Sequence, residues 1–313
     1  MSVVAAYVRG SHGRAVASAL LDHGQIDWAT VGRVRFSLRQ TLRYDYPSPI
    51  GRLRHRLMVL PPPQHGDQRL VSSGVAASGA DVAVRRGVDA FGNSRYDVRA
   101  AWVETMVEFE AWAVVERRAA DGPTRLPAAS LHDPRWLRPT PLTWPDQALE
   151  DAATRLARDH GDDPADALER ARSINTWVHK RMRYRLDVTN VDTTAARAFG
   201  LGQGVCQDYA HVMLAICRLG GLPARYVSGQ LLGEGGSHAW VEVLVPASGG
   251  DGAVAVAFDP THGRETGLSY LTVAVGRDYA DVAPTYGTFQ GASPGHLSTA
   301  KALGISEVDL LPG

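Results

Sequence analysis

The chain has 313 residues, of which 44% are hydrophobic and 21% charged, enough to bury one large core or two ordinary ones. Lysine plus arginine and aspartate plus glutamate both number 33, so no net field favours nucleic acid or an anionic membrane surface. No stretch approaches the roughly 20 apolar residues of a spanning helix, and Arg9 interrupts the N-terminal apolar run too early for a signal peptide. We expect two domains, a cytoplasmic location, and neither a nucleic-acid nor a membrane partner.

An antiparallel β-domain is predicted over residues 32–120, after an N-terminal extension, residues 1–31, that the pattern assigns to no domain. From Val34 to Tyr46, apolar side chains alternate with polar ones, which is typical of a half-buried strand. Further strands are expected at residues 53–60, 81–88, 96–101 and 103–116. Prolines 61–63 and a small-residue stretch at 72–80 are interpreted as separators between them.

A connector is expected over residues 121–145, where six prolines occur among few periodic residues. Helical signals resume after it, and Asp163-Pro164 is predicted to open a helix. The buried stripe of this helix is expected to consist of Ala167, Ala171, Ile174, Val178 and Met182. A second domain is predicted over residues 146–295, followed by a C-terminal tail, residues 296–313.

The chain contains only two cysteines, Cys206 and Cys217, and the run CQDYAHVMLAICRL between glycines predicts that one helix carries both. Helical rise separates the two thiols by roughly 16 Å, too far for a disulfide. Zinc is poorly supported, because there is no CxxC pair and His211 falls nearly on the opposite helix face from Cys206. Cys217, flanked by apolar residues, is interpreted as inert core.

Cys206 is expected at the start of this helix, directly after glycines at 200, 202 and 204. Unpaired backbone N–H groups and the helix dipole favour the thiolate there, which is the nucleophilic form of a cysteine. The same N–H groups could hold an oxyanion. The alternative is a small apolar side chain packed in a core.

A hairpin is predicted from the β-rich runs SHAWVEVLVP and VAVAFDPT. If Ser248 and Gly249 form a two-residue turn, antiparallel pairing places His238 directly opposite Asp259, with β-carbons about 5 Å apart. The carboxylate could then orient the imidazole as a catalytic base. A structural histidine and a turn-forming aspartate before Pro260 are the alternatives, and a one-residue slip would separate the two side chains.

Four segments of the chain resemble motifs of the bacterial transglutaminase-like proteins, in the papain-like cysteine-enzyme superfamily. These are GVCQDYAHVMLAICRLGGLPARYVSGQL, SHAWVEV, FDPTHG and GRDYADVAPTYGTFQG, within about residues 170–292. RYDYPSPI, the stretch 57–63 and DAFGNS are similar to the β-domain that often precedes this core. The chain departs from the family in two places. Residues 253–257 lack a tryptophan that is common there, and the sequence after about residue 295 does not resemble the family.

The resemblance implies an α+β fold: a papain-like or transglutaminase-like core, with its nucleophile helix packed on an antiparallel sheet, preceded by an antiparallel β-domain. It implies Cys206 as nucleophile, His238 as general base and acid, and Asp259 as the residue that orients His238. It also implies acyl transfer through a thioester, with a peptide or protein that presents an amide or glutamine side chain as substrate. An amine acceptor gives cross-linking and water gives hydrolysis, and the sequence leaves both open.

Three further residues are candidates for substrate contacts. Trp240 shares a strand face with His238 and could shield the site or form the floor of an acyl groove, although a core aromatic is the alternative. Asp208 and Tyr209 could line the cleft. No EF-hand loop or other dense oxygen-ligand motif is present, so we expect no cofactor and no metal.

Two functions of other classes are alternatives to an enzyme. The fold could serve as a catalytically silent module that binds a peptide or protein in its cleft. Alternatively, Cys206 could act as a redox sensor in a structural protein. The complete Cys206, His238 and Asp259 set favours the enzyme.

Overall fold

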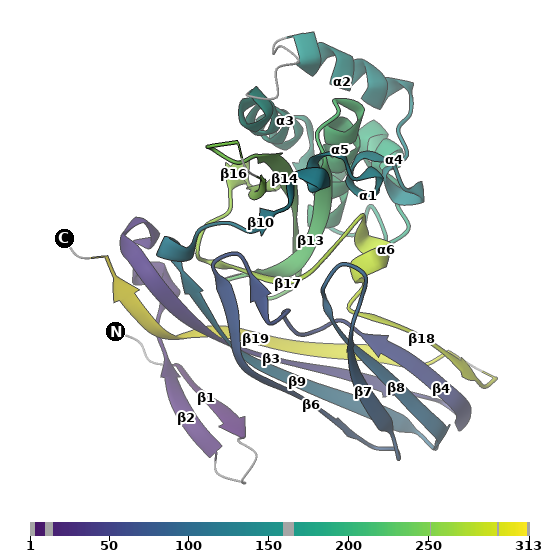
Figure 1. Ribbon diagram of the computed structural model, residues 1–313. Coiled ribbons are helices and arrows are strands. Elements are labelled where there is room, and N and C mark those ends of the chain that lie inside the picture. The colour runs from purple at the N-terminus through teal and green to yellow at the C-terminus, as the bar shows by residue number, and fades with distance from the viewer. Residues whose placement is uncertain (1–3, 10–14, 159–165, 251, 293, 312–313) are drawn as a thin grey trace.

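The computed structural model describes residues 4–9, 15–158, 166–250, 252–292 and 294–311. A β-domain lies below a layer of sheet and helices in the view of Figure 1. The expected α+β architecture, with helices on an antiparallel sheet and a separate β-domain, is confirmed.

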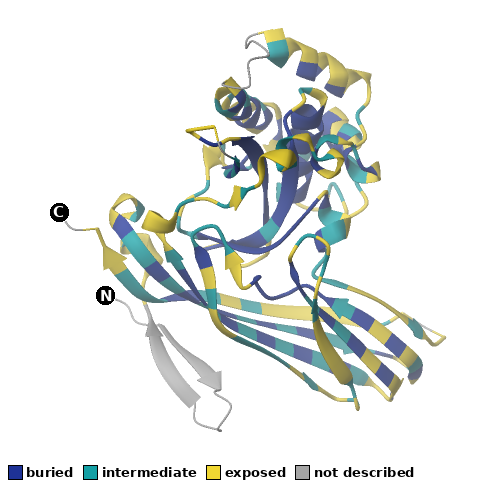
Figure 2. Ribbon diagram, viewed as in Figure 1, coloured by how far each residue is buried: buried dark blue, intermediate teal, exposed yellow. Residues whose placement is uncertain are grey.

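The β-domain consists of two antiparallel sheets, with strand orders β19-β3-β9-β6-β5 and β18-β4-β8-β7. Their strands are β3 (Val31–Asp45), β4 (Ile50–Leu57), β5 (Gln64–His65), β6 (Gln68–Ser78), β7 (Ala83–Val88), β8 (Ser94–Val103), β9 (Met106–Arg118), β18 (Thr285–Gln290) and β19 (His296–Leu310). Both sheets bury one face in a shared core, to which β3 contributes Phe36 and β8 contributes Val98. The alternation of buried and exposed residues that this produces is visible in Figure 2.

The small-residue stretch at 72–80 is not a separator, and this expectation was wrong. Most of it belongs to β6, which pairs with β9 from Gln68↔Arg117 to Ser78↔Glu108. At Gly74, a β-carbon would lie 2.7 Å from Nε1 of Trp112 on the neighbouring strand. Small residues therefore leave room for the side chains of β9, and this hid the strand from a search for large apolar residues.

The C-terminal segment is part of the β-domain rather than a separate tail, which corrects the assignment of residues 296–313. β19 pairs with β3 from His296↔Asp45 to Leu310↔Val31. β18, expected in the second domain, pairs with β4. β19 is an edge strand with one neighbour and mostly exposed residues, so it lacks the apolar alternation that marks a strand in sequence.

The first segment of the chain also contains structure. β1 (Val4–Arg9) pairs with β2 (Ala15–Leu20) in an antiparallel hairpin. After it, the Leu21 N–H donates to the Ile305 carbonyl at 2.9 Å. The segment assigned to no domain is thus attached to β19.

The remaining part of the chain contains a six-stranded sheet, ordered β10-β15-β14-β13-β17 with β16 beside β15, and the helices. Its strands are β10 (Arg125–Leu126), β13 (Ala224–Leu231), β14 (His238–Pro246), β15 (Ala253–Asp259), β16 (Arg264–Glu265) and β17 (Tyr270–Gly276). The helices are α1 (Pro134–Leu137), α2 (Gln147–Arg158), α3 (Ala167–Arg181), α4 (Ala195–Leu201), α5 (Cys206–Leu219) and α6 (Tyr279–Val282). A short parallel pair joins β11 (Arg183–Tyr184) to β12 (Gln203–Gly204).

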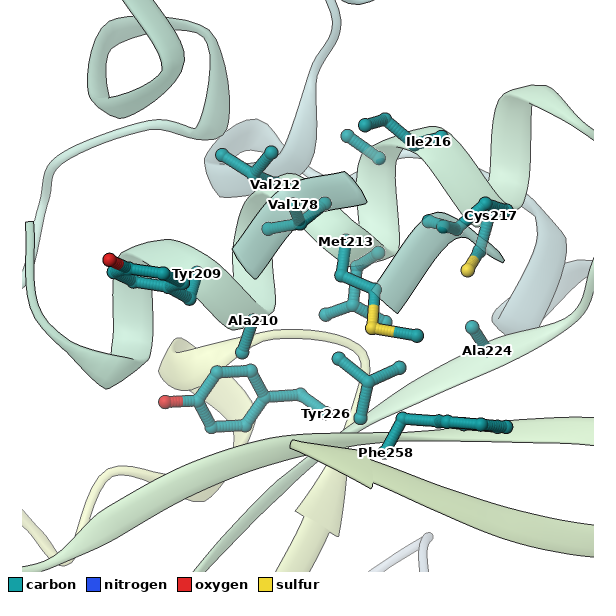
Figure 3. Close-up of a cluster of buried hydrophobic side chains, with 14 of the residues drawn as sticks. Val178, Tyr209, Ala210, Val212, Met213, Ile216, Cys217, Ala224, Tyr226 and Phe258 are labelled. Carbon is teal, nitrogen blue, oxygen red and sulfur yellow. The ribbon is translucent and has the colours of Figure 1, made fainter. Parts of the chain in front are cut away.

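Helix α5 forms the centre of the second core. Figure 3 shows Met213 and Cys217 turned toward the sheet, where Tyr226 and Phe258 lie. The stripe predicted for α3 is buried at all five positions. The predicted start of that helix, Asp163-Pro164, lies outside the described residues. No helix among the described residues is long and apolar enough to span a membrane.

Candidate active site

Cys206 occupies the first position of α5, as expected. Helix α4 ends at Gly202, whose φ of 62° lies in the left-handed region that favours glycine. β12 follows, and Val205 caps α5 in an extended conformation. The Cys206 thiol is partly exposed, whereas Cys217 is fully buried and burial raises the pKa of its thiol to about 12. Of the two cysteines, only Cys206 is placed to react.

Asp208 holds the start of α5 in place and does not line a cleft. Its Oδ2 accepts hydrogen bonds from the Val205 N–H and the Thr189 hydroxyl, both at 2.7 Å. A β-carbon at residue 204 would lie 2.4 Å from this same oxygen, so glycine is required there. Asp208 and Tyr209 are only 1% and 2% exposed, so the structure does not support the expectation that they contact substrate. Asp208 caps the helix, and Tyr209 packs in the core.

The hairpin that carries His238 and Asp259 has a different register from the one predicted. Val241 pairs with Phe258, which places Asp259 opposite Trp240, two positions from His238. The turn is longer than two residues, because Pro246 pairs with Ala253. A shift of two positions keeps both side chains on one face of the sheet, so His238 and Asp259 still meet diagonally.

Asp259 is the centre of a buried hydrogen-bond network. Its Oδ2 accepts from His238 Nε2, His262 Nδ1 and the Tyr270 hydroxyl, each at 2.7 Å. Its Oδ1 accepts the backbone N–H groups of Thr261 and His262. Burial by itself raises the pKa of Asp259, but the bond and charge of His238 outweigh it and hold the pKa well below its usual range.

His238 is consequently held with one ring nitrogen on Asp259 and the other turned the opposite way. Burial alone lowers the pKa of His238, but hydrogen bonds to Asp259, Cys206 and Glu234 raise it well above its usual value. The imidazolium form is therefore favoured next to the thiol of Cys206.

Glu234, in the turn between β13 and β14, contacts this arrangement from the outside. Its Oε2 lies 3.1 Å from His238 Nδ1, and its Oε1 lies 3.4 Å from His262 Nε2. The side chain is 39% exposed, and glycines stand at 233, 235 and 236 beside it. The contact with His238 lowers the pKa of Glu234. Glu234 thus occupies the ring nitrogen that Asp259 leaves free.

Trp240 is a buried aromatic beside His238. Its ring centroid lies 6.1 Å from that of His238 and 5.4 Å from that of Tyr270. It is 1% exposed. It also lines a cavity of about 350 Å³ at the junction with the β-domain, together with His65 and Glu242. Trp240 therefore positions the ring of His238 rather than lying open to a substrate.

Four residues of the site were not singled out from the sequence. His262 and Tyr270 share Asp259 with His238, Glu234 contacts His238, and Tyr184 lies on the strand paired with the segment just before Cys206. The charge of Cys206 contributes, after burial, to a raised pKa of Tyr184. His262 had a signal in FDPTHG, three positions after Asp259, whereas the others are brought in by tertiary packing.

The turn that presents Asp259 is supported from α3. The His179 Nδ1 lies 3.0 Å from the Thr261 carbonyl. With its amide oriented to satisfy its partners, Asn175 donates to the Asp259 carbonyl at 3.3 Å and accepts from the Arg264 N–H at 3.2 Å. The aspartate is therefore fixed from both sides of its backbone.

His238, Asp259 and His262 are also the one cluster in the described part of the chain with the spacing of a potential metal site. Their nitrogen–oxygen separations are 2.7 Å, which is a hydrogen-bond distance. Ligands that share a tetrahedral zinc ion would stand roughly 3.3 Å apart. Hydrogen bonds from the two histidines to Asp259 explain these distances, and we assign no metal to the cluster.

Comparison with known proteins matches both parts of the chain. The family model of the transglutaminase-like superfamily matches residues 154–277, and that of the bacterial transglutaminase-like N-terminal region matches residues 36–116. An uncharacterised protein of Mycobacterium leprae is 35% identical over 165 residues, which cover 50% of this chain and 55% of that protein. One from Mycobacterium tuberculosis is 33% identical over 131 residues, covering 38% and 41%. The chain spans about half the length of these curated relatives.

A solved structure has the same fold over nearly the whole chain. It is that of a protein from Cytophaga hutchinsonii, provisionally named a cysteine protease. It superposes with a TM-score of 0.70 at 20% identity and covers 90% of this chain and 93% of that one. The arrangement of a β-domain and a helix-on-sheet domain is therefore shared with it.

Proposed function

The chain belongs to the transglutaminase-like superfamily, and from this we propose that it is a cysteine-dependent enzyme that acts on an amide of a peptide or protein. The reaction is hydrolysis or transfer of the acyl group to an amine. Cys206 is the nucleophile, His238 the general acid and base, and Asp259 the residue that orients His238.

The observation that carries this proposal is the 2.7 Å contact that fixes His238 Nε2 on the buried Asp259 carboxylate, with the partly exposed Cys206 among the groups that raise the pKa of the ring. A core histidine would need one partner, whereas an acid and base catalyst needs a fixed orienter on one side and a nucleophile on the other.

In the first half of the reaction, the Cys206 thiolate attacks the carbonyl carbon of the amide. A carbon–sulfur bond forms and the π electrons move to the oxygen, where the Cys206 N–H at the helix start is placed to donate. When the carbon–nitrogen bond breaks, the His238 imidazolium gives its proton to the leaving amine. A thioester on Cys206 remains.

In the second half, neutral His238 takes a proton from water or from an incoming amine as that group attacks the thioester. The carbon–sulfur bond breaks, and the Cys206 thiolate and His238 imidazolium are restored. Asp259 stays ionised throughout and holds the ring. Glu234 and Tyr184 are both exposed, at 39% and 55%, and we take the substrate to approach from their side.

The test uses a glutamine-containing peptide with and without a fluorescent primary amine. Released ammonia, incorporated amine and peptide cleavage distinguish side-chain hydrolysis, transfer and proteolysis. We expect Cys206→Ala to abolish turnover and His238→Ala to reduce it by about 10³-fold or more. Cys217→Ala is the matched control and should retain activity. A wild-type chain that is inert toward a panel of such peptides, with a thiol no more reactive than in His238→Ala, would contradict the enzyme and favour the binding module.

A further inference from the structure

The outer face of the second β-sheet carries a concentration of arginines, although the chain as a whole has no net charge. Leu53, His55 and Leu57 of β4 turn into the core, so the residues between them turn to solvent. β8 and β7 add more arginines on the same side, as the pairing register shows. We call this surface the arginine face, and it consists of Arg52, Arg54, Arg56, Arg85, Arg95 and Arg99.

The charges on the arginine face are poorly balanced. Arg54 lies directly opposite Arg99 on the neighbouring strand. Among the described residues, neither Arg54 nor Arg99 forms an ion pair. The one carboxylate that lines the cavities of this face, Asp97, is bound to Arg95 at 2.9 Å, and the charge of Asp281 acts on Arg56 at the edge. Like charges directly opposed across two strands destabilise a sheet. A bound anion would remove this cost.

The arginine face is also hollowed. One cavity of about 340 Å³ is lined by Arg54, Arg56 and Arg99, and by Tyr286 on the edge strand β18. A second, of about 320 Å³, is lined by Arg52, Arg54 and Arg99. Because Arg54 and Arg99 border both, the two cavities form one shallow trough along β4 and β8.

We propose that the arginine face binds an extended, acidic polypeptide segment. Alternate residues of β4 have backbone positions about 6.7 Å apart along the trough, which is also the spacing of alternate residues in an extended peptide. Each guanidinium can bind a carboxylate through two parallel N–H donors. A segment with Asp or Glu at every second position matches this array.

The same surface fits other polyanions less well. Tyr286, whose ring is stacked under Arg56 at 5.6 Å, is the one aromatic ring among the trough-lining residues besides the buried His55. Single-stranded nucleic acid needs a row of aromatic stacking platforms. An anionic lipid surface would attract the arginines, but firm binding there also draws on apolar side chains that insert, and the trough offers few of these.

The experiment measures fluorescence anisotropy of a labelled peptide of alternating glutamate and serine, titrated with the full chain carrying Cys206→Ala. Binding is then read without turnover, so its outcome is independent of the proposed enzyme activity. We expect saturable binding that weakens with added salt. The double variant Arg54→Gln/Arg99→Gln should weaken it by about tenfold or more.

A matched control removes two arginines elsewhere. Arg155→Gln/Arg158→Gln, on α2, changes the net charge equally and should leave the affinity unchanged. The Arg54/Arg99 variant relieves a repulsion, so its thermal midpoint should not fall, and lost binding cannot be attributed to unfolding. Equal losses in both double variants would overturn the proposal. So would tighter binding of a thymidine oligonucleotide or of vesicles with anionic lipid than of the peptide.

Discussion

One carboxylate oxygen, Asp259 Oδ2, accepts three hydrogen bonds of 2.7 Å. This sharing explains why the pKa of Asp259 is held low despite burial, and why that of His238 is raised. Both shifts link stability to pH, with opposite signs. The network is therefore at once the orienting part of the proposed site and a pH-dependent contribution to folding.

We expect Asp259→Asn to destabilise the protein most between about pH 4 and 6.5. Because the pKa of Asp259 is depressed in the folded protein, its stabilising contribution is fully present above the unfolded pKa, near 3.9. This contribution is lost as the pH falls below that value. Because the pKa of His238 is raised in the folded protein, its stabilising contribution is fully present below the unfolded pKa, near 6.5. This contribution is lost as the pH rises above that value. Urea unfolding at pH 5.5 and 8.5 measures this, with the exposed Glu265→Gln as control. A difference in unfolding free energy that does not change between the two pH values would contradict it.

Glu234 contacts Nδ1 of His238, the ring nitrogen that Asp259 leaves free for the proposed nucleophile. We expect Glu234→Ala to raise the rate of Cys206 alkylation by iodoacetamide at pH 7.5. An ion pair of this exposure is worth up to about 1 kcal/mol, which corresponds to a rate change of up to about fivefold. Glu265→Ala removes an equally exposed carboxylate and should leave the rate unchanged. Slower alkylation of Glu234→Ala would show that Glu234 instead supports the thiolate.

At the scale of the element, β19 illustrates how a strand can escape recognition and still be essential. It forms one side of β3 along its whole length, and its Ile305 is fully buried in the β-domain core. The stability of such a strand comes from its partner and not from its own apolar pattern.

Deletion of residues 295–313 should therefore destabilise the β-domain, because β3 would lose a strand and expose the core beneath it. Circular dichroism melting should show a large fall in the thermal midpoint. Ser298→Ala, at an exposed position of the same strand, is the control and should melt like the wild type. A deletion variant with an unchanged midpoint would mean that this pairing contributes nothing.

At the scale of the whole molecule, two side-chain amides join the domains. Gln68 bonds both the N–H and the carbonyl of Thr272, and Asn93 bonds both groups of Val275. β17 is the edge of its sheet, so these amides take the place of a missing strand. Gln68 and Asn93 are each 1% exposed. The β-domain is thus fixed rigidly against the sheet that carries His238.

Gln68→Ala/Asn93→Ala should separate the unfolding of the two domains. Each substitution leaves two buried backbone groups of β17 without partners, at a cost of about 1–3 kcal/mol per group. Calorimetry should resolve two transitions where the wild type shows one. Gln64→Ala, at an exposed position, should behave as the wild type. A single transition shifted only slightly would indicate that apolar packing at Leu271 and Val273 holds the junction by itself.

Much of the fold could be predicted from local signals. The alternation after Val34 marked β3, and the glycine-bounded apolar run marked α5 with Cys206 at its start. The partnership of His238 with Asp259 was inferred from a wrong register, yet it held, because a shift of two residues preserves the face of a strand. Asp208 and Tyr209 were misjudged because proximity to Cys206 in sequence does not show which helix positions are buried.

From the amino-acid pattern alone, the helix that starts at Cys206, the pairing of His238 with Asp259 and the α+β fold class could be predicted, because each leaves a local signal or a motif. Four features were found only once the chain was folded: the role of β19, the amide contacts of Gln68 and Asn93, the approach of Glu234 and Tyr270 to the site, and the gathering of arginines on one sheet face. Glu234 and Tyr270 lie near their partners in sequence, and their approach depends on how the intervening turns fold. The other features arise from pairings or contacts between segments distant in the chain. Such pairings are selected by the packing of the whole molecule, which no local periodicity encodes.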